Sequence, residues 1–232
     1  MAEWIAIAAP ADQAEGTEMV VAGWLDDGRQ VRIRYFWDAA IAPGLPNSPP
    51  LDVTRHQQYP LEDRYRICPL SDGGTVTTDD VLELWGREGA LRDQGDQEEA
   101  HRRVREVQLV ATDGEEVAGV SSVFLLHNPQ LRMDLWHYRT YVARAHRKSN
   151  LAAQLIFGNR DLMEERFIKG EDTRGAGMIF ELENEGMKQY FNRALWLPAD
   201  FTFIGENERG DHVRVHYFPG ARVPVLRPAP TG

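Results

Sequence analysis

Alternation of apolar and polar positions predicts β-structure in several parts of the chain. In residues 18–37 the alternation continues on both sides of Asp27-Gly28, a tight-turn dipeptide, which predicts a β-hairpin. A second and longer hairpin is predicted over residues 107–126, with its turn at Asp113-Gly114. Further strands are predicted over residues 64–70, 131–143, 177–182, 201–205 and 212–218.

Apolar residues at helical spacing predict helices between these strands. The strongest pattern spans residues 150–167, where Leu151, Leu155 and Ile156 fall on one face. Residues 78–91 predict a helix with Thr78 as its cap and acidic residues in the first turn. Two further helical segments are predicted over residues 96–107 and 185–196, the second stopping at Pro198.

This order of elements predicts an α+β fold in which helices flank a mixed, mostly antiparallel central sheet. Five prolines lie between residues 43 and 60, and such a density of proline predicts a linker or an ordered loop. We therefore expect two parts: residues 1–58, an N-terminal β-hairpin extension with a proline-rich linker, and residues 59–232, the main domain.

Composition narrows the functional classes. The chain has 232 residues, of which 42% are hydrophobic, and a net charge of −10, so nucleic acid is not an expected partner. The negative charge favours a cationic or neutral partner, or serves solubility alone. Cys68 is the single cysteine, so no internal disulfide is expected, and its apolar neighbours predict a buried side chain.

The remaining bulk features predict a cytoplasmic protein without metal or membrane contacts. The N-terminus has no basic n-region, and the longest apolar strip is shorter than the ~20 residues that span a bilayer. His212 and His216 fall on one face of a predicted strand, but this spacing is too wide for a metal pair and no third ligand accompanies them. We expect no metal site.

Positive charge is concentrated immediately before the 150–167 helix. Arg144, Arg147 and Lys148 lie within five residues together with a His, and Ser149 follows as a capping or donating residue. A helix N-terminus offers unpaired amide groups and a positive dipole end, which suit a phosphate. The pattern predicts an anion cradle for a phosphorylated ligand. The alternative is an ordinary solvated basic loop that caps a helix.

The same stretch resembles the cofactor motif of the GNAT acyltransferase superfamily. In that family a strand ending in Val leads into a loop Gln/Arg-x-x-Gly-x-Gly/Ala, which opens the longest helix. Here Val142 ends the strand, Arg147, Leu151 and Ala152 match the loop, and Asn150 stands where the middle Gly is typical. The resemblance covers residues 62–218, and the order of predicted elements agrees along that length.

Two further positions carry the resemblance downstream. The family places an Asn after the next strand and an aromatic residue, often Tyr, seven residues later. Here Asn184 follows the strand, Phe191 stands at the aromatic offset, and Tyr190 comes one residue earlier. A phenyl ring cannot donate a proton to a thiolate, so the resemblance leaves three options: Tyr190 acts as the acid, the thiolate leaves unassisted, or catalysis is lost.

The resemblance implies an acyl-CoA co-substrate, usually acetyl-CoA, whose acyl group is transferred to a small-molecule amine or a protein amino group. The backbone amides of residues 147–152 would hold the pyrophosphate, residues 142–144 would pair with the pantetheine arm, and Asn184 would lie near the pantetheine or the thiol. The implied cofactor-binding set is Val142, Ala143, Arg144, Arg147, Lys148, Ser149, Asn150, Leu151, Ala152, Asn184 and Phe191.

The strand before the motif carries the candidate bases. Its even-numbered face holds Asp134, Trp136 and Tyr138, and its odd face holds His137. His137 has the free pKa best suited to a general base, and Asp134 is the second choice. Tyr190 completes the candidate catalytic set as the acid.

Three hypotheses follow. The first is an acyl-CoA-dependent N-acyltransferase. The second is a catalytically weak or silent GNAT-like module that binds CoA or a protein partner. The third is an acyltransferase that makes a signalling lactone or modifies a ribosomal protein, which nothing in the sequence selects. Three roles stay open for the N-terminal hairpin: it extends the sheet, covers the acceptor cleft or forms a homodimer.

Overall fold

The computed structural model describes residues 20–33, 35, 40–42, 59–71, 74–90 and 97–222. The chain divides into two compact units, described here separately. The helical unit comprises residues 53–125 and 136–172, and the hairpin unit comprises residues 1–52, 126–135 and 173–232. Most of the predicted proline-rich linker and the boundary near residue 58 lie outside the described residues, so the predicted division into residues 1–58 and 59–232 stays a prediction.

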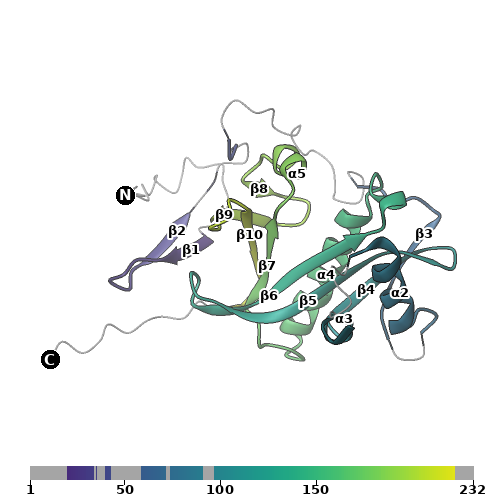
Figure 1. Cartoon of the computed structure of the whole chain (residues 1–232). Helices are drawn as coiled ribbons and strands as arrows, with labels where there is room; N and C mark the ends of the chain where they lie inside the picture. Colours follow the sequence, from purple (N-terminus) through teal and green to yellow (C-terminus); the bar gives the residue numbers. More distant parts are fainter. Residues whose placement is uncertain are drawn as a thin grey trace. The chain divides into compact units, whose positions relative to one another are not determined.

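The helical unit holds the region that the cofactor motif occupies (Figure 1). Its strands follow the order β3-β4-β5-β6, and the pairs β3–β4 and β4–β5 are antiparallel. Strands β5 and β6 continue beyond this unit, because the end of β5 and the start of β6 belong to the hairpin unit. The elements are β3 (Tyr65–Pro69), α2 (Thr78–Glu88), α3 (Gln97–Val104), β4 (Val107–Asp113), β5 (Glu116–Asn128), β6 (Met133–Val142), a 3-10 turn (Arg144–His146) and α4 (Leu151–Ile168).

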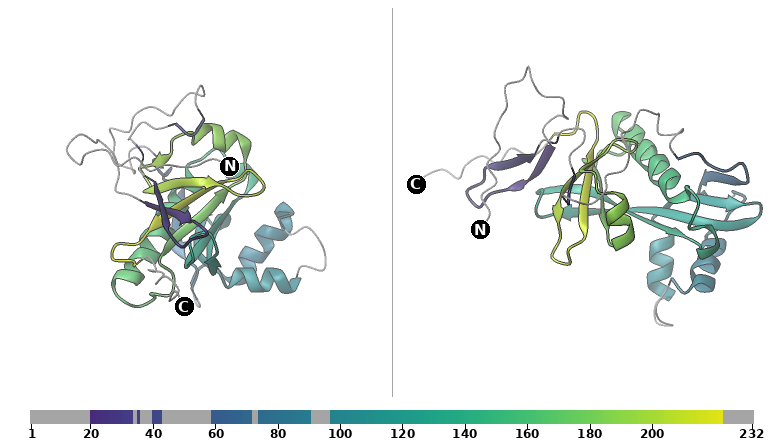
Figure 2. Two further views of the ribbon diagram at one scale, coloured as in Figure 1. Left: turned by 90° about the vertical axis from the view of Figure 1, so that its left-hand side faces the viewer. Right: turned by 90° about the horizontal axis from the view of Figure 1, so that it is seen from above.

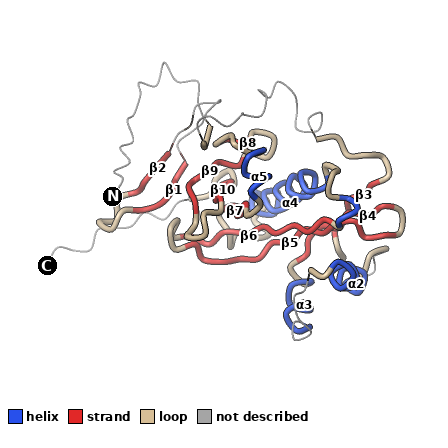
Figure 3. Tube along the Cα trace, turned by 45° about the horizontal axis from the view of Figure 1, so that its top comes forward, coloured by secondary structure: helices blue, strands red, loops and turns tan. Residues whose placement is uncertain are grey.

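Two hydrophobic clusters cover the two faces of these strands. Figures 2 and 3 show helix α4 on one side of the strands and helices α2 and α3 on the other. Alternate residues of β4 point to opposite faces. Leu109 packs with Leu151 and Leu155 of α4, whereas Val110 packs with Leu84 of α2. Helix α4 therefore covers one face and helix α2 the other. This packing places the start of α4 directly after the end of β6.

The predicted cap of the first of these helices is wrong by one residue. Thr77, rather than Thr78, is the N-cap of α2, and its side chain accepts a hydrogen bond from the Asp80 amide. The Asp80 carboxylate accepts in return from the Thr77 amide at 2.7 Å, which completes a capping box. The helix ends at Gly89, whose φ of 63° is a left-handed conformation that glycine adopts without strain.

The hairpin unit is built from antiparallel strands. Strands β1 (Val20–Trp24) and β2 (Gln30–Ile33) form the predicted N-terminal hairpin. Four further strands follow the order β7-β10-β9-β8, and each neighbouring pair is antiparallel. They are β7 (Gly177–Leu182), β8 (Leu195–Trp196), β9 (Phe201–Glu206) and β10 (His212–Tyr217), with the short helix α5 (Glu185–Tyr190) after β7.

The predicted helix over residues 185–196 is wrong beyond Tyr190. Phe191 has φ −94° and ψ 45°, which ends the helix. Arg214, which is fully buried, donates a hydrogen bond of 2.7 Å to the Phe191 carbonyl, and Leu195–Trp196 pairs with β9 instead. Tertiary hydrogen bonds therefore overrule the helical periodicity of this segment.

The predicted fold class is confirmed. The described elements form an α+β fold with mostly antiparallel strands and flanking helices, in the predicted order, and the N-terminal hairpin is present. Among the described residues, no helix has the combination of length and apolar character that crossing a bilayer requires. Cys68 is only partly buried, in contrast to the expected buried side chain.

Candidate functional site

The backbone after β6 makes a tighter turn than the sequence predicts. Ala143 still donates its amide to Ala118 at 2.9 Å, so the chain stays on the sheet to that point. A 3-10 turn follows, and the amides of Arg147 and Ser149 donate to the carbonyls of Arg144 and His146 at 3.5 and 3.2 Å. Two of the six amides predicted to hold a pyrophosphate are therefore directed into the turn itself.

The other amides of this loop are differently placed. Leu151 donates its amide to the Ser149 hydroxyl at 3.3 Å. The amides of Lys148, Asn150 and Ala152 have no acceptor among the residues that the structure describes. Helix α4 starts at Leu151 without an acidic residue in its first turn, so no side chain of its own neutralises the positive end of its dipole. Three donors and a dipole end remain for an anion.

The three cations of the loop are not equivalent. The Arg147 guanidinium donates to the Val142 carbonyl at 3.1 Å and approaches the Tyr141 hydroxyl at 3.5 Å, which holds it against β6. The Arg144 side chain is exposed, and its guanidinium lies 4.0 Å from the Glu88 carboxylate. Lys148 is exposed and has no ion pair within the described part of the chain. Lys148 is therefore the cation most available to a ligand.

His146 anchors the loop, a role that sequence analysis missed. Its side chain is 6% exposed, and Nδ1 lies 3.0 Å from the Tyr65 hydroxyl, which also accepts a hydrogen bond from Arg64 at 2.5 Å. The His146 carbonyl accepts from the Ser149 hydroxyl at 2.6 Å. The sequence shows a His inside a basic run, but only the fold shows that this ring is buried.

Asn150 takes the position of the motif's middle glycine without adopting a glycine conformation. Its φ is −85° and its ψ is 12°, so left-handed geometry is not needed here. Its side-chain amide donates to the Pro60 carbonyl at 2.9 Å. Asn150 thus ties the loop to the segment before β3, and its own backbone amide is among the three donors without an acceptor.

The two candidate bases belong to different units. Asp134, in the hairpin unit, is exposed, whereas Trp136 and Tyr138 are buried. Leu135 is buried as well as Trp136, so both faces of β6 are covered at that point. One Asp134 oxygen lies 2.8 Å from Nδ1 of His127.

His137, in the helical unit, is half-buried. Its ring packs on Phe124, with 5.2 Å between the ring centroids. Its role as a base stays a prediction, as does that of Asp134.

The downstream candidates lie in the hairpin unit. Asn184 is the N-cap of α5, and its side-chain oxygen accepts from the Met187 amide at 3.0 Å. The Phe191 ring packs edge-on against Trp196 at a centroid distance of 4.8 Å. Tyr190 ends α5, but its side chain lies outside the described part of the chain. Asn184 and Phe191 thus have structural contacts of their own, and their cofactor roles stay predictions.

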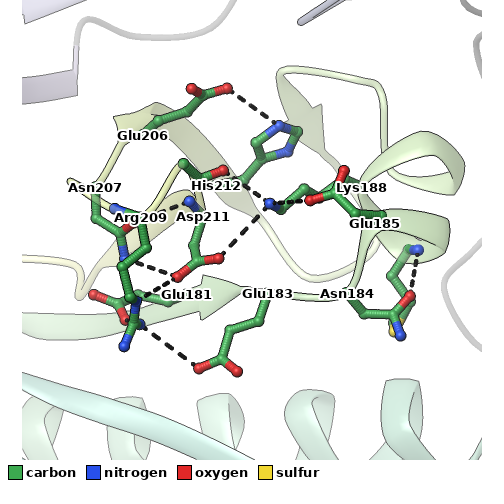
Figure 4. A network of polar contacts seen from close by, with 12 residues as sticks. Glu181, Glu183, Asn184, Glu185, Lys188, Glu206, Asn207, Arg209, Asp211 and His212 are labelled. Atoms are coloured by element: carbon green, nitrogen blue, oxygen red, sulfur yellow. Dashed lines mark hydrogen bonds and ion pairs between the residues drawn. The ribbon is translucent and has the colours of Figure 1, made fainter.

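A polar network at β7, α5 and β10 brings three carboxylates together (Figure 4). One oxygen each of Glu181, Glu183 and Asp211 lies within 4.8 Å of the others. Arg209 donates to Asp211 at 2.8 Å and to Glu181 at 2.7 Å, and Lys188 lies 3.7 Å from Asp211. Arg209 and Lys188 offset part of this negative charge, and the ion pairs of Arg209 join the end of β7 to the residues before β10.

A pocket of about 160 Å³ lies in the helical unit, and Tyr141 is one of its lining residues. The Arg147 guanidinium lies 5.7 Å from the centroid of the same Tyr141 ring. The pocket and the loop before α4 therefore share one aromatic side chain of β6.

Comparison with known proteins gives structural matches only. No family model matches the sequence, and no curated protein matches it. Among solved structures, the chain is similar to a GNAT-family acetyltransferase from Streptococcus pneumoniae, with 11% identity, a TM-score of 0.47, and coverage of 67% of this chain and 99% of that one.

Two further matches are of the same kind. An aminoglycoside 6'-acetyltransferase type Ii gives 13% identity, a TM-score of 0.44, and coverage of 66% and 96% of the two chains. A ribosomal-protein-S5-alanine acetyltransferase from Vibrio fischeri gives 12% identity, a TM-score of 0.44, and coverage of 69% and 97%. The matched structures are acetyltransferases, the class that the sequence motif resembles. At this level of similarity they assign neither an activity nor a substrate.

Proposed function

We propose that this chain is a GNAT-type N-acyltransferase, which takes the acyl group of acetyl-CoA or another acyl-CoA and transfers it to a primary amine. The observation that carries the proposal is the loop between β6 and α4. Arg147, Leu151 and Ala152 match the family's motif, and the amides of Lys148, Asn150 and Ala152 have no acceptor among the described residues.

This loop suits a diphosphate on physical grounds. Each phosphate oxygen accepts hydrogen bonds, and amides at a helix N-terminus donate in the direction of the favourable dipole end. The side chains of Lys148 and Arg144 are exposed, so both can turn toward a bound phosphate and add positive charge beside it. The overall charge of −10 opposes an anion at long range, so the affinity must come from these short contacts.

The pantetheine arm would pair with backbone groups that now form hydrogen bonds with side chains. The Val142 carbonyl accepts from Arg147, and the Arg144 amide donates to Glu88 at 3.1 Å. A pantetheine arm that pairs with this segment would replace both contacts. The amide and carbonyl groups of the arm would take their place, so the Val142 carbonyl and the Arg144 amide would stay hydrogen-bonded.

In the proposed reaction the amine nitrogen forms a bond to the acyl carbon and the carbon–sulfur bond breaks. The amine's proton passes to a base, for which His137 and Asp134 are the candidates. The departing thiolate takes a proton from Tyr190 or leaves unassisted. The acceptor is a small molecule or a protein amino group.

A silent CoA-binding or protein-interaction module is the second candidate. Phe191 favours it, because its ring packs on Trp196 and has no proton to donate. In this version the loop before α4 binds CoA or no ligand, no amine is acylated, and the N-terminal hairpin serves a protein partner.

Calorimetric titration with acetyl-CoA is the first test. We expect measurable heat and a raised melting temperature. No heat and no thermal shift at millimolar ligand would reject the acyltransferase and would leave only the protein-interaction form of the second candidate.

Once binding is established, thiol release measured across a panel of amines separates the two candidates. Turnover that persists in Phe191→Ala and disappears in Tyr190→Phe would assign the acid to Tyr190. CoA binding without thiol release for any amine would favour the silent module.

A further inference from the structure

The pocket beside Tyr141 is small and is lined by both apolar and charged side chains. Its volume is about 160 Å³, and a cavity of roughly 150 Å³ accommodates benzene, so it has room for a single six-membered ring or a short apolar chain. The rings of Trp85 and Tyr141 contribute apolar walls. Ser122 and Thr140 contribute hydroxyl groups, and Arg103 and Arg139 contribute two cations.

The charges around this pocket do not balance. Arg102 pairs with both nearby carboxylates, at 2.6 Å from Glu99 and 2.6 Å from Glu106. Arg103 shares Glu99 at 2.6 Å, whereas the nearest carboxylate oxygen to Arg139 belongs to Glu106 at 3.7 Å. Among the residues that the structure describes, two carboxylates thus pair with three guanidinium groups, and Arg139 has the longest of these distances.

Arg139 is nevertheless held in place. Its guanidinium carbon lies 4.0 Å from the centroid of the Phe124 ring, a stacking contact that orients the planar group. The Arg139 guanidinium donates no hydrogen bond to any residue that the structure describes. Burial, and then the charge of Arg103, lower the pKa of Arg139 below its usual value, as expected where an anion is missing.

We propose that the acceptor is a small amine that also carries a carboxylate, with Arg139 as the principal carboxylate ligand, Arg103 as the second, and the ligand's body between Trp85 and Tyr141. A carboxylate matches the fork of a guanidinium with two parallel hydrogen bonds. This inference rests on the proposed acyltransferase function, because Tyr141 immediately precedes the Val142–Arg144 segment assigned to the acyl arm. The local charge here is positive, opposite to that of the chain as a whole.

Binding of benzoate and benzamide, without any CoA, tests the pocket alone. The two probes have nearly the same shape and differ in charge. Followed by ligand-observed NMR, benzoate should bind wild-type protein roughly tenfold or more tightly than benzamide. Arg139→Gln should remove this preference, and Arg139→Lys, which keeps the charge but not the fork, should retain part of it.

Arg87→Gln is the matched control. Its side chain is 43% exposed against 45% for Arg139, it pairs with Glu116, and it does not line the pocket. This variant loses the same charge and should keep the full preference for benzoate. Thermal melts of all three variants check folding. Equal binding of the two probes to wild-type protein, or a preference that survives Arg139→Gln, would overturn the assignment.

Thiol release from acetyl-CoA with L-phenylalanine and phenethylamine, which differ by one carboxylate, tests the acceptor class. Faster release with phenylalanine, lost in Arg139→Gln, supports the inference. Faster release with phenethylamine overturns it while leaving the acyltransferase function standing. A preference for benzoate without thiol release from any amine has the opposite meaning: the pocket binds carboxylates, and both the acyltransferase function and the acceptor role fall.

Discussion

The variant Ala152→Pro tests how much a single backbone amide contributes to the proposed binding of CoA. Ala152 is the second residue of α4, and its amide has no acceptor among the described residues. Proline is tolerated in the first turn of a helix because the missing N–H has no intrahelical partner there. Ala152→Pro therefore removes one donor without breaking an internal hydrogen bond.

The size of the effect follows from the kind of hydrogen bond. A hydrogen bond to a charged group contributes about 1.5–3 kcal/mol. Ala152 is partly exposed, so water screens the contact and the lower end applies. At about 1.4 kcal/mol per factor of ten, the Kd for CoA should rise roughly tenfold to thirtyfold.

Asp79→Pro provides the matched control. Asp79 is also the second residue of its helix, α2, and lies outside the loop before α4. Calorimetry with acetyl-CoA should show weakened binding for Ala152→Pro only, and circular dichroism should show similar melting temperatures for both variants. A folded Ala152→Pro protein with unchanged Kd would refute the assignment of this amide to the diphosphate.

Two other predictions concern stability. Hydrogen bonds from two arginines lower the pKa of Glu99 to about 2, so its stabilising effect is complete above its ordinary pKa of 4.5 and is lost as the pH falls toward 2. Between pH 4.5 and 2, the urea midpoint of unfolding should therefore fall less steeply with falling pH in Glu99→Gln than in the wild-type protein. The difference between the two proteins should be larger at low salt than at high salt. Equal slopes of midpoint against pH in the two proteins would contradict this. Gly177→Ala should destabilise the protein by about 3 kcal/mol or more, because a Cβ at Gly177 would lie 2.9 Å from the Tyr217 Cα and closer still to the neighbouring carbonyl of β10. A denaturant midpoint close to wild type would show that this strand pair can separate.

Local sequence patterns predict an element well where they agree with its packing. The turn at Asp27-Gly28 and the periodicity over residues 150–167 both correspond to elements of the structure, β1–β2 and α4. The pattern fails at Phe191, where helical spacing continues but the chain turns to form β8. The carbonyl of Phe191 accepts from Arg214, a residue 23 positions later in the chain. No window of neighbouring residues contains that contact.

The features of the candidate site likewise divide into those that the sequence locates and those that depend on the fold. The basic run and the motif around Val142 and Ala152 locate the loop before α4 from sequence alone. Whether its amides are available depends on the 3-10 turn, and the exposure of Asp134 next to buried Leu135 depends on what packs against each face of β6. The Arg139 pocket depends on α2, α3, β5 and β6 meeting in space, so no single segment indicates it.

The sequence by itself determined most of the segments that become strands and helices, and the place of the basic loop before α4 along the chain. Those properties follow from the spacing of side chains within one or two turns or strands, which neighbouring residues set. Only the tertiary structure decided which amides lack acceptors, that His146 is buried against Tyr65, and that Arg139 is left short of an anion. Each of these depends on hydrogen bonds and charges contributed by residues distant in the chain, which come together only when the strands and helices pack.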